Sequence, residues 1–167
     1  ADVDVAGVDV DGLPEIVLDG LRRRGQTLSV AESCTGGLIS AHLTDVPGAS
    51  DVFLGGVVTY SNEAKEQLVD VPHEALVEHG AVSEPVARAM AENVRALLQT
   101  DFGVATTGNA GPTKGDSDAP VGRVYLGIAG PEGSFAREFT MGNHRERITR
   151  KSVHKAFEML QREILKF

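Results

Sequence analysis

The sequence has a single cysteine, Cys34, and no tryptophan among its 167 residues. One thiol cannot form an internal disulfide or supply the several sulfur ligands of a multi-cysteine zinc site. Apolar stretches are only a few residues long, whereas a membrane-spanning helix needs about 20 apolar residues. No basic segment followed by an apolar core opens the chain, so no signal peptide is predicted. We therefore expect a reduced, cytoplasmic protein that does not cross a membrane.

The chain also has fewer basic than acidic residues. The chain has 16 lysines and arginines against 24 acidic residues, for a net charge of −8. Nucleic-acid-binding proteins usually present a basic face that neutralises phosphates. The two basic clusters, at residues 22–24 and 145–155, fall in predicted helices, where a run of charge usually forms a solvated face. The composition thus argues against direct nucleic-acid binding and favours a small-molecule partner.

The length fits one domain, because a chain of this size buries about 70% of its unfolded surface without needing a disulfide or a metal. Residues 1–12 alternate valine with aspartate and are predicted to form a loose lead-in, followed by a single domain at 13–167. Apolar periodicity predicts helices at 13–24, 36–44, 61–68, 72–79, 83–97 and 145–165 and strands at 27–31, 53–60, 102–107, 123–129 and 135–141. This order predicts an α/β fold, a three-layer α/β/α sandwich whose mixed, mostly parallel sheet is closed by a C-terminal hairpin and helix.

The strongest chemical signal lies at residues 31–37, which read Ala-Glu-Ser-Cys-Thr-Gly-Gly between a strand and a helix. Open α/β sheets bind ligands at the carboxyl ends of their strands. Free N–H groups at a helix start favour an anion or a developing oxyanion. Ser33 or Cys34 is therefore a candidate nucleophile. The alternative is that Ser33 only caps the helix and the glycines only turn the chain.

A nucleophilic serine needs a base, and the histidines offer none in an obvious position. All five lie in predicted helices or at their edges: His42, His73, His79, His144 and His154. Lys65 is the better candidate, because Tyr60 and Lys65 follow a strand and can both face the ligand crevice. A lysine that is buried or crowded by an arginine loses its proton more easily. The alternative is an ordinary surface lysine at the start of a helix.

A third cluster follows another strand, where residues 106–112 read Thr-Thr-Gly-Asn-Ala-Gly-Pro. Glycines and hydroxyls suit a loop that lines a ligand. Taken singly each cluster is weak, but the ends of parallel strands meet at one edge of a sheet. The three clusters are therefore predicted to form one site.

These segments resemble the CinA C-terminal domain family, whose members are known as competence/damage-inducible proteins and nicotinamide-mononucleotide deamidases. The resemblance rests on segments 31–37, 58–65, 79–84, 108–112, 120–122 and 124–125, in order, and it spans roughly residues 13–165. The chain departs from the family pattern at Asn109, where an aliphatic residue is usual. It departs again before the last helix, where Gly142-Asn143-His144-Arg145 replaces Gly-Asp-Arg. Arg145 fits the family arginine best, with Arg147 as the second candidate.

The resemblance implies an amidohydrolase that converts nicotinamide mononucleotide to nicotinic acid mononucleotide and ammonia. Ser33 is then the nucleophile and Lys65 the base, while Tyr60 assists proton transfer. The residues expected at the substrate are Thr35, Gly36, Gly37, Thr107, Gly108, Asn109, Ala110, Gly111 and Arg145. No metal or other cofactor is expected, because the sequence has no metal-ligand spacing, and a homo-oligomer is expected. The alternative function is a non-catalytic regulator that binds a nucleotide or a DNA-repair protein.

Overall fold

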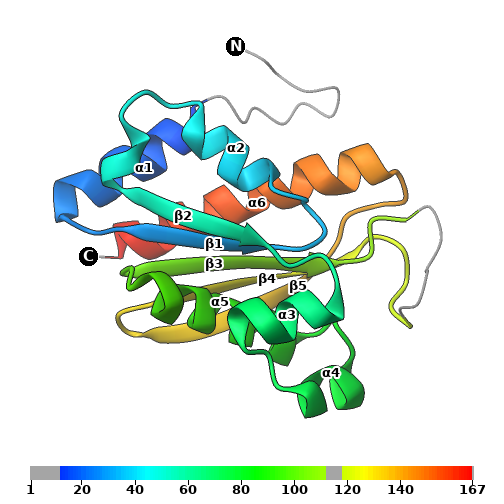
Figure 1. Cartoon of the computed structure of the whole chain (residues 1–167). Coiled ribbons are helices and arrows are strands. Elements are labelled where there is room, and N and C mark those ends of the chain that lie inside the picture. Colours follow the sequence, from blue (N-terminus) through cyan, green and yellow to red (C-terminus); the bar gives the residue numbers. More distant parts are fainter. Residues whose placement is uncertain (1–11, 112–117, 167) are drawn as a thin grey trace.

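The structure, a computed structural model, describes residues 12–111 and 118–166. The predicted lead-in at 1–12 lies outside these ranges except for Gly12. The helices are α1 (Leu13–Arg24), α2 (Leu38–Thr44), α3 (Asn62–Val69), α4 (His73–His79), α5 (Glu84–Leu98) and α6 (Arg145–Leu165), with a short 3-10 turn at Ala49–Asp51. The strands are β1 (Leu28–Glu32), β2 (Phe53–Val58), β3 (Phe102–Gly108), β4 (Arg123–Gly130) and β5 (Gly133–Thr140). Helices and strands alternate from α1 to α3, after which two more helices, three strands and a last helix follow (Figure 1).

The five strands form one sheet in the order β2-β1-β3-β4-β5. Strand β1 pairs in parallel with both β2 and β3, and the pairs β3–β4 and β4–β5 are antiparallel. The mixed sheet is therefore confirmed, but "mostly parallel" and "closed" are wrong. Parallel and antiparallel pairings are equal among the described strands, and the C-terminal hairpin forms an edge of an open sheet.

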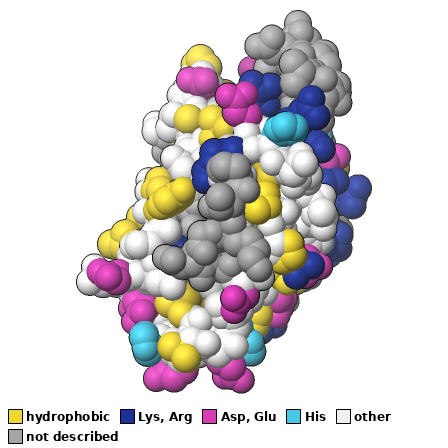
Figure 2. Space-filling view, turned by 90° about the vertical axis from the view of Figure 1, so that its right-hand side faces the viewer, with side chains coloured by type: hydrophobic (Ala, Val, Ile, Leu, Met, Phe, Trp, Pro, Cys, Tyr) yellow, Lys and Arg dark blue, Asp and Glu magenta, His cyan; other side chains and the backbone are white. Residues whose placement is uncertain are grey.

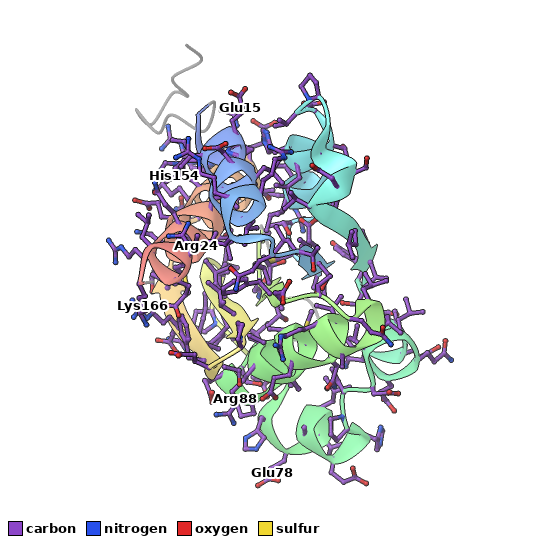
Figure 3. The ribbon with its side chains drawn as sticks, turned by 90° about the vertical axis from the view of Figure 1, so that its left-hand side faces the viewer. Glu15, Arg24, Glu78, Arg88, His154 and Lys166 are labelled. Atoms are coloured by element: carbon purple, nitrogen blue, oxygen red, sulfur yellow. The ribbon has the colours of Figure 1, made fainter. Side chains whose placement is uncertain are left out.

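Helices cover both faces of the sheet, which confirms the three-layer sandwich (Figure 1). Helices α1, α2 and α6 pack on one face over the larger core, which includes Leu21 and Phe157. Helices α3, α4 and α5 pack on the other face over a smaller core around Met90. Figure 3 shows the two outer layers, with Glu15 of α1 and Glu78 of α4 at opposite ends of the molecule. None of the helices in residues 12–111 and 118–166 has both the length and the apolar character to cross a membrane.

The parallel pairing of β1, β2 and β3 places three chain segments at one edge of the sheet. Strand β1 leads into Ser33, β2 leads into Thr59 and Tyr60, and β3 leads into Asn109. In Figure 1 these strand ends point to the right. The sequence-predicted clusters thus converge there because the strands run in the same direction.

Helix α5 packs closely on the sheet because two strand positions lack a side chain. A Cβ at Gly127 would lie 2.6 Å from the carbonyl oxygen of Ala87, and one at Gly103 would collide with the carbonyl oxygen of Ala91. Both carbonyls belong to the α5 backbone, which cannot move aside as a flexible side chain can. Glycine is therefore required at these positions by the distance between helix and sheet.

We predict that Gly103→Ala lowers the free energy of unfolding by about 1–3 kcal/mol, because overpacking forces the backbone of α5 away from the sheet. Gly55→Ala is the matched control, since its added Cβ would meet only Leu98 Cδ1 at 3.4 Å. Urea denaturation of both variants measures the difference. Equal stability of the two variants would contradict the packing argument.

Candidate active site

Ser33 sits in a tight turn directly after β1. Its backbone N–H donates to both the carbonyl oxygen and the Oγ1 of Thr106 on β3, at 3.0 and 3.2 Å. Its carbonyl oxygen accepts from the N–H of Gly36 at 3.0 Å, which closes the turn. The residue is buried, with 7% of its surface exposed. The neighbouring strand therefore fixes the backbone that carries the Ser33 hydroxyl.

Lys65 reaches the same point from α3. That helix begins after Ser61, whose Oγ accepts from the N–H of Ala64 at 3.0 Å, as an N-cap does. Lys65 then falls on the buried side of the helix, with 2% of its surface exposed. Its Nζ lies 3.1 Å from Ser33 Oγ and donates to the carbonyl oxygen of Thr59 at 2.9 Å. The expected contact between the serine and the lysine side chains is thus present in the geometry.

Burial lowers the pKa of Lys65 from 10.5 to about 8. The sequence-based expectation that a nearby arginine contributes is wrong, because desolvation alone lowers this pKa. At pH 7 a lysine with this pKa is neutral in roughly 10% of molecules, against well under ~0.1% for an ordinary lysine. A neutral amine at hydrogen-bond distance from a serine hydroxyl can accept its proton.

Cys34 directly follows Ser33, and its thiol is the other candidate nucleophile. The thiol is buried, and desolvation is the main cause that raises its pKa to about 12. A thiol with this pKa is protonated near neutrality, and the thiolate is the nucleophilic form. Of the two candidate nucleophiles that the sequence leaves open, Ser33 is the one whose side chain is hydrogen-bonded to the Lys65 amine.

Two cavities meet at Ser33. The larger has a volume of about 690 Å³ and is bordered by the start of α3, by α4 with the loop that follows it, and by the end of β3. Its acidic and basic side chains among the described residues are Glu63, Lys65, Glu78, His79 and Asp118. The smaller has a volume of about 120 Å³ and is lined by Ser33, Cys34, Tyr60, Gly108, Asn109, Ala110 and Arg145.

The charges at this end of the molecule are separated. Figure 2, which looks onto the end where β1–β3 terminate, shows acidic and histidine side chains at the bottom, where α4 lies, and basic side chains toward the upper right. Among the described residues, the larger cavity has three acidic side chains and the smaller one has Arg145 as its only charged residue. A ligand with an anionic group is therefore favoured on the Arg145 side.

Tyr60 and Arg145 border the cavities, but among the described residues no hydrogen bond joins either side chain to the Ser33 hydroxyl. Tyr60 is 62% exposed and borders both cavities, and among the described residues its hydroxyl has no hydrogen bond to Ser33 or Lys65. Arg145 is the first residue of α6 and lines the smaller cavity, whereas Arg147 lines neither cavity. Arg145 is thus the arginine beside Ser33.

The expectation of a free anion site at the start of the helix after Ser33 is wrong. The carboxylate of Glu32 accepts from the N–H groups of Ile39 and Ser40, both at 2.9 Å, so the first turn of α2 is already capped. Thr35, Gly36 and Gly37 line neither cavity at Ser33. The two glycines adopt φ values of 60° and 100° and turn the chain into α2, which begins at Leu38 rather than at residue 36.

The loop after β3 borders the site as its composition predicts, although its polar groups are partly used within the protein. Thr107 lines the larger cavity and its hydroxyl donates to the carbonyl oxygen of Ala81 at 2.8 Å. Asn109 borders both cavities, and its amide bonds the carbonyl oxygen of Ala119 and the N–H of Gly111. Gly111 lines neither cavity. Asn109 therefore lines the cavities and also stabilises the loop through these hydrogen bonds.

Sequence reasoning missed part of the cavity wall. Residues 76–82, which form the end of α4 and the turn after it, line the larger cavity together with Ser61, Asn62 and Glu63. Segment 79–84 carried the family resemblance without a role assigned to it, so the signal was present in the motif. Within residues 12–111 and 118–166, no three histidine, cysteine, aspartate or glutamate side chains come together as a metal site would require.

Fold and contacts together define an α/β domain with a serine and a buried lysine at the carboxyl edge of its sheet. Residues 10–164 match the CinA C-terminal domain, and the chain belongs to that family. A CinA-like protein of Parasynechococcus marenigrum is 50% identical over 161 residues, which cover 95% of this chain and 38% of that protein. A CinA-like protein of Gloeobacter violaceus is 47% identical over 167 residues, 39% of its length. The chain thus spans about two fifths of these relatives.

Solved structures of similar proteins share the fold. The competence/damage inducible protein CihA from Agrobacterium tumefaciens is 38% identical, with a TM-score of 0.86 over 90% of this chain and 92% of that chain. The competence damage-inducible protein A from Klebsiella pneumoniae is 32% identical, with a TM-score of 0.89 over 93% of this chain and 96% of that chain. These likenesses confirm the family and the three-layer architecture.

The lowered pKa of Lys65 predicts a specific dependence of stability on pH. Protonating the buried amine destabilises the folded state fully below its folded pKa of about 8, and this penalty fades as the pH rises toward 10.5. Lys65→Met removes the penalty. The unfolding free energy of Lys65→Met, taken relative to the wild type, should therefore fall by about 2 kcal/mol between pH 7 and pH 9.5.

Urea denaturation at the two pH values measures this difference. Lys166→Met changes an exposed lysine and is the control, for which the difference from the wild type should stay nearly constant. A difference for Lys65→Met that does not change with pH would show that the amine titrates as it does in water.

Proposed function

We propose that this domain hydrolyses the carboxamide of nicotinamide mononucleotide through an acyl-enzyme on Ser33. The single observation that carries the proposal is the 3.1 Å contact between Lys65 Nζ and Ser33 Oγ in a buried position that borders two cavities. Membership in the CinA C-terminal domain family gives the substrate class, since members of this family are known as nicotinamide-mononucleotide deamidases.

In the first half of the reaction, neutral Lys65 accepts the Ser33 proton while Oγ attacks the carboxamide carbon. The carbonyl oxygen of Thr59 holds one N–H of the amine, which leaves the lone pair for the serine. The resulting ammonium returns its proton to the amide nitrogen as the C–N bond breaks. Ammonia leaves, and the acyl group stays on Ser33 as an ester.

In the second half, a water molecule attacks the ester and Lys65 accepts the water proton. The lysine then protonates Ser33 Oγ as the acyl–oxygen bond breaks, and the carboxylic acid is released. The oxyanion of each tetrahedral intermediate needs a donor. The N–H groups of Ile39 and Ser40 at the start of α2 are bonded to Glu32, so we assign this role to the N–H of Cys34, the residue directly after the nucleophile.

The charges around Ser33 orient the substrate. We place the phosphate on the Arg145 side, where α6 also begins and its N–H groups favour an anion. The pyridinium ring carries a positive charge and is placed toward the larger cavity with its acidic side chains. Tyr60 borders both cavities and is placed to assist proton transfer once the substrate covers it.

Ammonia release from nicotinamide mononucleotide by the purified protein tests the proposal. Ser33→Ala should reduce the rate by several orders of magnitude, because the acyl-enzyme can no longer form. Cys34→Ala should keep most of the activity, because its thiol is protonated and is not the nucleophile. The reverse pattern would make the protein a cysteine hydrolase. Absence of turnover across several pyridine nucleotides would favour the non-catalytic regulator.

The pH dependence tests the role of Lys65 as a base. The free enzyme is active when Lys65 is neutral, so kcat/KM should rise about tenfold per pH unit below the pKa of about 8 and level off above it. Lys65→Arg should be nearly inactive across this range, because a guanidinium keeps its charge. Substantial turnover in Lys65→Arg would show that the residue supplies only positive charge.

A further inference from the structure

Glu32 is a fully buried carboxylate next to the nucleophile, and it has four hydrogen-bond donors. Besides the N–H groups of Ile39 and Ser40, it accepts from Ser40 Oγ at 2.9 Å and from Thr35 Oγ1 at 2.6 Å. Both backbone N–H groups can only donate, and each of them donates to a different oxygen of the Glu32 carboxylate. This arrangement is that of an ionised carboxylate held by a helix start.

The charge of Glu32 fixes the direction of a chain of hydroxyls. Because an ionised carboxylate only accepts, the Thr35 hydroxyl donates its proton to Glu32. Thr35 Oγ1 lies 2.8 Å from Thr106 Oγ1, so Thr106 must be the donor in that pair. Thr106 Oγ1 then has a lone pair toward the N–H of Ser33, at 3.2 Å. Every hydrogen bond from Ser33 to Glu32 therefore points the same way.

We infer that Glu32 is a positioning residue for Ser33, acting through Thr35 and Thr106. The inference rests on the proposed role of Ser33 as nucleophile. Reversing or breaking the chain turns the Thr106 hydroxyl and removes one of the two acceptors of the Ser33 N–H. The turn then loses the constraint that aims Ser33 Oγ at Lys65. Displacements of about 1 Å in a reacting group can reduce a rate about 100-fold.

A simple capping role for Glu32 gives a different expectation. A cap on α2 stabilises that helix through Ile39 and Ser40, and neither residue contacts Thr106 in the hydrogen bonds of the described chain. Under capping alone, Thr106 acts on Ser33 only through its own bond to the Ser33 N–H, and Glu32→Gln and Thr35→Val leave the reactivity of Ser33 unaffected. Under positioning, changes at Glu32 and Thr35 slow Ser33 by way of Thr106, which among the described residues has no hydrogen bond to α2.

Three variants separate these roles: Thr106→Val, Thr35→Val and Glu32→Gln. The readout is the rate at which phenylmethanesulfonyl fluoride modifies Ser33, measured by mass spectrometry of the intact protein, with Ser33→Ala as the control. We expect each variant to react about 10- to 100-fold more slowly than the wild type. Thr106→Ser, which keeps the hydroxyl, should react at nearly the wild-type rate. Thermal melting shows which variants are folded.

The double variant Glu32→Gln/Thr106→Val completes the test. Because both changes break one chain, its rate should be within a few-fold of the slower single variant rather than the product of the two effects. Wild-type reactivity in folded Thr106→Val, equal losses in Thr106→Ser and Thr106→Val, or an unreactive Ser33 in the wild type would each overturn the inference.

The same proteins are assayed for ammonia release from nicotinamide mononucleotide. A reactive Ser33 that slows in these variants, in a protein without amidase activity, would contradict the proposed function and leave the positioning role supported. Amidase activity together with wild-type reactivity of Ser33 in all three variants would support the proposed function and contradict the positioning role of Glu32.

Discussion

The buried amine of Lys65 against the hydroxyl of Ser33 is the contact on which the rest of the site depends. An amine loses hydration when it is buried, and among the described residues its only hydrogen-bond partners are the Thr59 carbonyl and the Ser33 hydroxyl. The protein thereby holds a group whose protonation destabilises the folded state at neutral pH. Such an arrangement lowers stability and, in the proposed mechanism, provides the base. Because the hydroxyl adds no charge, the lowered pKa comes from the burial itself.

The sheet topology explains why Ser33 and Lys65 meet. Ser33 and Thr59 follow neighbouring parallel strands, and their carboxyl ends share one edge. Strand β3, on the other side of β1, contributes Thr106 beneath the Ser33 turn and the loop that begins at Gly108. The antiparallel hairpin β4–β5 contributes no residue to either cavity, and α6 returns the chain so that Arg145 reaches the site. The parallel half of the sheet thus builds the proposed reactive centre, and the chain after the hairpin supplies the arginine that we propose binds the anionic group.

Most helices and strands were predictable because apolar periodicity is a local signal. The convergence of the three motifs at one edge of the sheet was predictable because each motif follows a predicted strand. The pairing of Ser33 with Lys65 was predictable in part, since Ser33 directly follows β1 and Lys65 lies in the first turn of the helix that follows β2. The occupied start of α2 was not predictable, because Glu32 directly follows the predicted strand at 27–31 and its contacts with Ile39 and Ser40 depend on how the turn folds back. The cause of the low Lys65 pKa was also hidden, since burial depends on packing and the sequence pointed equally to an arginine. The open sheet differs from the predicted closure because β5 has a free edge, which no periodicity records.

Capture of the acyl-enzyme tests the central claim most directly. The protein is mixed with nicotinamide mononucleotide, quenched in acid within the first turnovers, digested, and examined by mass spectrometry. The account predicts an ester that adds the acyl group of nicotinic acid mononucleotide to the peptide containing Ser33, and no such adduct in Ser33→Ala. Lys65→Arg should form it far more slowly, because the serine keeps its proton. Ammonia release without any adduct on Ser33, or an adduct on Cys34, would contradict the account.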